Sequence, residues 1–204
     1  MGIRCTRWPA AALLAAISTA ASAGPLKVVQ VTAPAVNCVY SKTCTVVVSD
    51  TVGQLPLGNL DNKNTAWLQS RTFTGAAGTP AAGLTGYEYR LDMTQASGSL
   101  ECIGGVVINF GPIAQLPFAN NTPADAYVIT KGGLGTIGVS AAQASDVITF
   151  TFDKAICASE PANAANTTFF FGLASVHPPT NISAGIFGTG NPPYYSIPAL
   201  APQH

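Results

Sequence analysis

The chain has 204 residues with 9 basic and 9 acidic side chains, and 9% of its residues are charged against 48% hydrophobic. No basic block is present, which argues against a nucleic-acid-binding protein and against a polybasic membrane-surface patch. The length fits one domain with a sizeable core, and the absence of a fixed-period repeat argues against a solenoid or propeller.

The N-terminal segment, residues 1–23, has the order of a cleavable secretory signal. Arg4 and Arg7 precede a short apolar run, and small residues lead to Ala23. The run is shorter than the roughly 20 apolar residues of a spanning helix, so we expect no membrane span after processing. Loss of both arginines from 9 basic and 9 acidic residues leaves a mature net charge of about −2. The short alanine-rich signal is typical of bacteria and predicts a secreted or periplasmic protein.

Four cysteines remain after processing: Cys38, Cys44, Cys102 and Cys157. An even number in an exported chain favours disulfides over a metal site, and no C-x-x-C spacing is present. Three pairings are open. We favour Cys38 with Cys44, which flank a short polar-tipped segment, and Cys102 with Cys157, which would join two distant predicted strands. We expect neither a metal nor a cofactor.

Strand signals dominate the mature chain in the order 26–32, 43–49, 67–74, 87–93, 103–110, 127–130, 147–152, 169–171 and 182–187. Between them lie segments rich in Gly, Pro, Asn and Ser, as turns require. Eight or nine short strands predict an all-β fold, a two-sheet antiparallel sandwich or jelly roll stapled by disulfides. We divide the mature chain into a sandwich domain at 24–190 and a proline-rich tail at 191–204, expected at a sheet edge.

Two connecting segments have specific interpretations. Gly132 to Gly138 superficially resembles a phosphate-binding loop, but the following lysine and helix are missing, so we interpret it as a hairpin connection. Ser140 to Ser145 is the one stretch that could form a helical turn.

The segment 87–93 alternates cleanly and predicts a half-buried strand. Tyr87, Tyr89 and Leu91 fall on one face, and Glu88, Arg90 and Asp92 on the other.

Candidate catalytic groups are few. His177 is followed by two prolines, and no G-x-S-x-G elbow is present, so a serine triad is disfavoured. Glu88 and Asp92 share a strand face but lie about 13 Å apart by the rise per residue. This exceeds the roughly 5 to 9.5 Å of glycosidase carboxylates. A partner such as Glu101 or Asp146 could change that, but we favour a solvated strand face and expect no catalytic residue.

Two further groups of polar residues have ordinary explanations. The oxygen-rich loop with Asn59, Asp61, Asn62 and Asn64 departs from the EF-hand spacing, so an Asx-turn loop is preferred over a calcium site. Glycosylation patterns begin at Asn120, Asn166 and Asn181 and matter only in a host that modifies them.

Aromatic residues provide the remaining clue to a ligand. Trp67, Tyr194 and Tyr195 lie beside polar or proline-rich segments and could stack on a neutral glycan. The alternatives are that Trp67 lies in the core and that the two tyrosines cover a sheet edge. The sequence therefore favours an exported, non-catalytic structural or adhesive protein that meets another surface protein or a glycan. The rival interpretation is a secreted carbohydrate-binding or carbohydrate-active protein.

Overall fold

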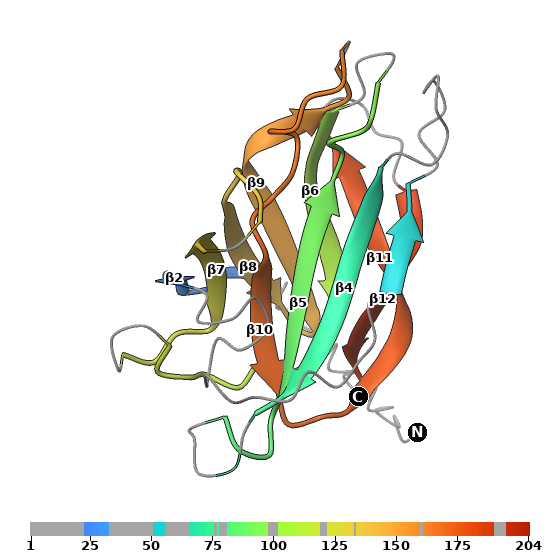
Figure 1. The fold of residues 1–204 in the computed structure, drawn as a ribbon. Coiled ribbons are helices and arrows are strands. Elements are labelled where there is room, and N and C mark those ends of the chain that lie inside the picture. Colours follow the sequence, from blue (N-terminus) through green and yellow to red (C-terminus); the bar gives the residue numbers. More distant parts are fainter. Residues whose placement is uncertain are drawn as a thin grey trace, which may run out of the picture.

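The computed structural model describes residues 23–32, 51–55, 66–75, 77, 81–97, 102–118, 122–132, 134–159, 161–189 and 195–204. Within these ranges the regular elements are strands, and they form two sheets of six strands each. The layer that contains β4, β5 and β10 lies in front of the layer that contains β6 and β9 (Figure 1). The expected all-β, two-sheet fold is confirmed, with 12 strands where eight or nine were expected.

Sheet A and sheet B are defined by their strand orders. Sheet A runs β1 (Gly24–Pro25), β8 (Val139–Ala144), β9 (Val147–Cys157), β6 (Cys102–Asn109), β11 (Pro179–Gly188) and β12 (Tyr195–Pro202). Sheet B runs β2 (Val28–Thr32), β7 (Ala126–Lys131), β10 (Phe171–Ser175), β5 (Thr85–Asp92), β4 (Trp67–Thr74) and β3 (Thr51–Gln54). Neighbouring strands are antiparallel, apart from β2 and β7, which are parallel.

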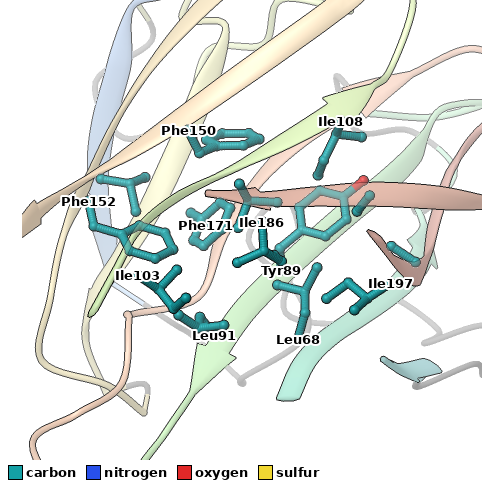
Figure 2. Close-up of a cluster of buried hydrophobic side chains, with 14 of the residues drawn as sticks. Leu68, Tyr89, Leu91, Ile103, Ile108, Phe150, Phe152, Phe171, Ile186 and Ile197 are labelled. Carbon is teal, nitrogen blue, oxygen red and sulfur yellow. The ribbon is translucent and has the colours of Figure 1, made fainter. Parts of the chain in front are cut away.

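The main core fills the space between the two sheets. Strand alternation directs Tyr89 and Leu91 from β5 inward, and they meet Ile108 of β6 and Phe150 of β9 (Figure 2). The three consecutive phenylalanines at 169–171 lead into β10, and they contribute side chains to both faces of sheet B. Phe171 belongs to the main core, whereas Phe170 belongs to a second buried cluster that is defined below.

A disulfide joins Cys102 and Cys157, as expected. The two residues lie directly opposite each other where β6 pairs with β9, at the ends of the two strands. The bridge therefore closes a long loop between two residues that strand pairing already holds close to each other. The predicted partners Cys38 and Cys44 lie outside the described residues.

The proline-rich tail forms the edge strand β12, as expected. The Leu200 N–H does not bond to β11 but donates to Ser70 Oγ of β4 at 3.0 Å, and the Leu200 carbonyl accepts from the Tyr89 hydroxyl at 2.7 Å. Because backbone groups alternate in direction along a strand, Pro198 and Pro202 occupy two of the other outward-pointing positions and have no N–H to expose, whereas Ser196 keeps its N–H. The Ser70 side chain and two prolines thus satisfy or remove the donors at three positions of this edge.

Part of the outer face of sheet B, which points away from the main core, is also buried. Its side chains include a second apolar cluster that consists of Val31, Phe73, Tyr127, Ile129 and Phe170. Two of the rings lie over glycines directly opposite them, Phe73 over Gly86 and Tyr127 over Gly172, where an added Cβ would overlap the ring. Glycine at these positions lets the rings lie flat against the sheet.

Two local expectations are wrong. Residues 140–145 do not form a helical turn, because β8 pairs with β9 from Val139 to Ala144 and the chain turns at Ser145, which has a positive φ of 53°. The segment from Gly132 to Gly138 is not a hairpin, because it leads from β7 in sheet B to β8 in sheet A. The glycines of this segment correctly indicated a connection between strands. They carried no information on the sheet to which the next strand belongs.

Candidate functional site

A polar network is buried on the outer face of sheet B. Glu88 of β5 is fully buried, and the Tyr127 hydroxyl of β7 donates to Glu88 Oε1 at 3.0 Å. Arg71 of β4 lies directly opposite Glu88 in the strand register. A buried carboxyl group is costly without hydrogen bonds, so the phenol and the carboxyl group depend on each other.

Two guanidinium groups share one aromatic ring beside this carboxyl group. Arg71 Cζ lies 4.5 Å and Arg90 Cζ 5.3 Å from the centroid of the Phe170 ring. Arg90 also forms an ion pair with Asp92 at 2.9 Å, and its Nε donates to Gln69 Oε1 at 3.3 Å. Both arginines therefore have partners on the sheet surface, and the cluster links strands β4 and β5 to the segment that precedes β10.

The expectation of a solvated face for Glu88, Arg90 and Asp92 is wrong. The alternation along β5 is as predicted, but Glu88 is 0% exposed and Asp92 5%. The reason is the second apolar cluster, which covers the same face with rings from β4, β7 and residue 170. The half-buried strand predicted for 87–93 is consequently buried on both faces.

The described carboxyl groups do not form an acid–base pair on this face. Asp92 accepts from the Thr94 backbone and hydroxyl and pairs with Arg90, whereas Glu88 bonds to Tyr127. Asp146 lies in the β8–β9 turn of the other sheet, and Glu101 is outside the described residues. The arrangement holds strands together and presents no carboxyl pair to a substrate.

Tyr127→Phe tests the structural role of this network. The substitution removes the hydroxyl group that donates to the buried Glu88 carboxyl group. We therefore expect a loss of about 1 to 3 kcal/mol in the free energy of unfolding. Urea denaturation measures the loss. Lys154→Ala at an exposed position of β9 is the control and should change stability by less than about 0.5 kcal/mol. Equal losses in the two variants would contradict a special role for the Tyr127–Glu88 bond.

Two core tyrosines connect the sandwich through their hydroxyl groups. Burial raises the pKa of Tyr89 well above its ordinary value, and the neighbouring Tyr87 raises it further. Burial also raises the pKa of Tyr87, against a smaller opposing effect of a hydrogen bond with Thr85. The Tyr87 hydroxyl donates to the His177 carbonyl at 2.8 Å. Both phenols are therefore held in the neutral form by the folded protein.

These raised pKa values predict unfolding in alkali. The neutral phenol is favoured in the folded state, so its stabilisation is complete below pH ~10, the ordinary pKa of tyrosine in the unfolded chain. This stabilisation is lost as the pH rises above ~10 toward the pKa of the tyrosine in the folded state. The free energy of unfolding then falls by up to about 1.4 kcal/mol per pH unit for each tyrosine. Denaturation followed between pH 8 and 12 measures the slope. Tyr89→Phe should make the free energy of unfolding less dependent on pH in this range. An unchanged slope in that variant would contradict the raised pKa of Tyr89.

The aromatic residues proposed for ligand stacking do not form one platform. Trp67 is half-buried at the start of β4, on the outer face of sheet B, whereas Tyr195 starts β12 in sheet A and packs against the main core. Tyr194 lies outside the described residues, as does the oxygen-rich loop of Asn59, Asp61, Asn62 and Asn64. A stacking role thus has its clearest geometric support at Trp67.

His177 and the glycine-rich segment have structural roles in the backbone. The His177 carbonyl accepts from Tyr87, and its N–H donates to Ser175 Oγ at 3.3 Å. In the glycine-rich segment, the N–H groups of Thr136 and Ile137 both donate to the Thr167 carbonyl. These amides are occupied within the protein, which agrees with the interpretation that the segment is not a phosphate-binding loop.

Asn166 and Asn181 head two of the sequence patterns for glycosylation and differ in environment. The Asn166 side-chain amide donates to the Cys157 carbonyl at 2.7 Å and to Ser159 Oγ at 3.2 Å, which fixes it against the chain. Asn181 is exposed on β11. Asn120 lies outside the described residues.

A cavity of about 120 Å³ is lined by residues of β2 and β7 of sheet B and of β8 and β9 of sheet A. Strands β2, β7 and β8 lie at the left of Figure 1. Val28, Val128 and Val139 form its apolar lining. Its polar lining residues are Gln30, Thr130 and Asp153, and the Asp153 carboxylate lies against Gly138, which also lines the cavity. We call this region the seam cavity. Sequence reasoning missed it, because its residues come from four separated strands and share no motif.

No protein-family model matches this chain, and no curated protein matches it. The site must therefore be interpreted from its own chemistry. Among the described residues, no cluster of three or more His, Cys, Asp or Glu side chains is placed to hold a metal ion. The same part of the chain contains no helix that is long and apolar enough to cross a membrane.

Proposed function

We propose that the protein is exported as a precursor and acts as a non-catalytic structural or adhesive β-sandwich, in the periplasm or outside the cell. The observation that carries the proposal is the position of the first strand. β1 begins at Gly24, which pairs with Gln143, immediately after the expected cleavage site at Ala23. Removal of residues 1–23 would leave every described strand intact.

The disulfide supports the same compartment. Bridges such as Cys102–Cys157 persist in oxidising environments and are rare in the cytosol of bacteria that grow at moderate temperature. A bridge that fixes two neighbouring strands also suits a protein that must keep its shape without chaperones.

The outer face of sheet A supports a structural or adhesive role. Alternation along β9 directs Val147, Thr149 and Thr151 outward, and the residues opposite them in β8 are Ala144, Ala142 and Ser140. These side chains are small and uncharged. Such a face suits contact with a weakly charged polymer or surface and offers nothing to a polyanion such as nucleic acid.

Expression of the full chain in a Gram-negative bacterial host tests export. We expect the protein in the periplasm or the medium, with Gly24 as its first residue and no cysteine open to alkylation before reduction. The control carries Leu13→Arg with Leu14→Arg, which interrupts the apolar run of the signal and should leave unprocessed protein in the cytoplasm. Wild-type protein with an intact Met1 in the cytoplasm would contradict the proposal.

Glycan recognition is the second candidate, and the position of Trp67 favours it. This side chain is half-buried on the outer face of sheet B, which leaves part of the indole open to a sugar ring. Binding of the mature protein to a glycan array should be lost in Trp67→Ala and kept in Tyr195→Phe. Equal binding by wild type and Trp67→Ala would contradict it.

A further inference from the structure

The two sides of the sandwich are closed to different extents. On one side, β12 of sheet A lies against sheet B, where Leu200 bonds to Ser70 and the Pro198 carbonyl approaches Gly53 of β3. On the other side, β2 ends sheet B, and the two-residue strand β1 ends sheet A. Within the described part of the chain, the side formed by β1 and β2 is therefore the more open of the two.

Among the described residues, no strand pairs with the outer side of β2, and β2 itself carries none of the usual features that protect a sheet edge. Its sequence, VVQVT, contains neither proline nor a charged side chain, and its register shift falls only at the last step, between Val31 and Thr32. An unprotected edge offers a row of N–H and C=O groups to an additional strand. Edge β12, by contrast, carries Pro198 and Pro202.

The seam cavity lies directly beside this edge. Val28 and Gln30, which alternate with the outward-facing Val29 and Val31, line the cavity from β2. A strand added to β2 would continue sheet B, so its own inward side chains would enter the region between the sheets next to Val28 and Gln30. The volume of about 120 Å³ is similar to the cavity of about 150 Å³ that holds a benzene molecule, and so admits one side chain.

We propose that the seam binds an extended peptide of a partner protein, which adds a strand to β2 and places one lysine or arginine side chain in the seam cavity. Val28, Val128 and Val139 would contact the aliphatic stem, and the Asp153 carboxylate would pair with the cationic end. Lys27, which directly precedes β2, does not occupy this position, because its ammonium group donates to the Pro123 carbonyl at 2.8 Å.

This inference rests on the proposed adhesive role and names the partner chemistry of that role. Peptide binding is measured on the purified mature protein, whatever its route of export. Failure of peptide binding with correct processing would overturn this inference alone. Failure of export with intact peptide binding would overturn only the proposed localisation.

The test uses a capped seven-residue peptide of alternating valine and threonine with lysine at its centre. Titration into isotope-labelled mature protein should shift the amide signals of Val28–Thr32, Gly138 and Val139. The same peptide with norleucine at its centre keeps the stem without the charge, and we expect its Kd to be about threefold to fivefold higher. A peptide N-methylated at alternate amides cannot pair with β2 and should bind at least tenfold more weakly.

Matched variants of the protein locate the cationic subsite. Asp153→Asn removes the charge at an exposed position and should abolish the preference for lysine over norleucine while it leaves the norleucine Kd unchanged. Asp146→Asn, which alters an exposed carboxylate in the turn of the same hairpin, should retain the preference. Circular dichroism checks that both variants fold.

Three results would overturn the proposal. The first is shifts confined to regions away from β2 and the seam. The second is equal affinity for the lysine, norleucine and N-methylated peptides. The third is a concentration-dependent doubling of mass without added peptide that is lost in Val29→Pro, because a second copy of the chain would then occupy the edge.

Discussion

Replacement of Cys102 and Cys157 together by serine is expected to lower the free energy of unfolding by about 4 kcal/mol. The bridge joins residues separated by 55 positions, and in the chain-entropy model a loop of that length restricts the unfolded ensemble by roughly this amount. The two residues are direct partners in the β6–β9 register, so the native sheet keeps its pairing without the bond. The loss should therefore arise mainly in the unfolded state.

Guanidinium denaturation of the oxidised wild type and of the double variant measures this loss. The companion variant, Cys38→Ser with Cys44→Ser, is expected to lose only about 2 kcal/mol if those residues form the predicted short loop, because loop-closure entropy grows with the logarithm of loop length. An equal or reversed order would show that strain or residual structure in the unfolded chain decides instead.

Phe171→Ala is expected to destabilise the protein by about 3 to 5 kcal/mol. Phe171 is fully buried between the sheets, and its ring centroid lies 4.7 Å from Phe150, 5.9 Å from Tyr89 and 6.4 Å from Phe152 (Figure 2). Removal of the ring loses its burial and leaves a cavity bordered by side chains from both sheets. These neighbours are anchored in paired strands and cannot collapse fully into the space.

The matched control is Val176→Ala, at a residue that is 65% exposed in the turn after β10. It should change stability by less than about 0.5 kcal/mol. Thermal and urea denaturation of both variants provide the comparison. A loss below about 1.5 kcal/mol for Phe171→Ala would mean that this part of the core relaxes around the missing ring.

Part of the structure could be predicted from local sequence. The period-two pattern placed β4 at 67–74 and identified which side chains of β5 share a face, because successive side chains of a strand point to opposite sides. The prolines of the tail predicted an edge strand, because proline has no N–H for a central ladder. The Cys102–Cys157 bridge was the favoured choice among three open pairings, and the structure contains it.

The candidate sites were harder to predict. Periodicity separates the two faces of a strand but does not say what covers each face, so Glu88 was expected in solvent and is buried beneath rings from other strands. Glycines at 132–138 signalled a turn, yet only the pairing of β8 with β9 decided that the chain crosses to the other sheet. The seam cavity combines Val28, Val128 and Asp153, which are far apart in the sequence.

The sequence by itself determined the all-β class, the alternation along the strands and the edge position of the tail. Each of these depends on interactions within a few residues or on residue type. The tertiary structure alone decided the partners of each strand, the burial of the Glu88 network and the open seam beside β2. Those features depend on contacts between distant segments, whose energies are set by packing and desolvation rather than by local pattern.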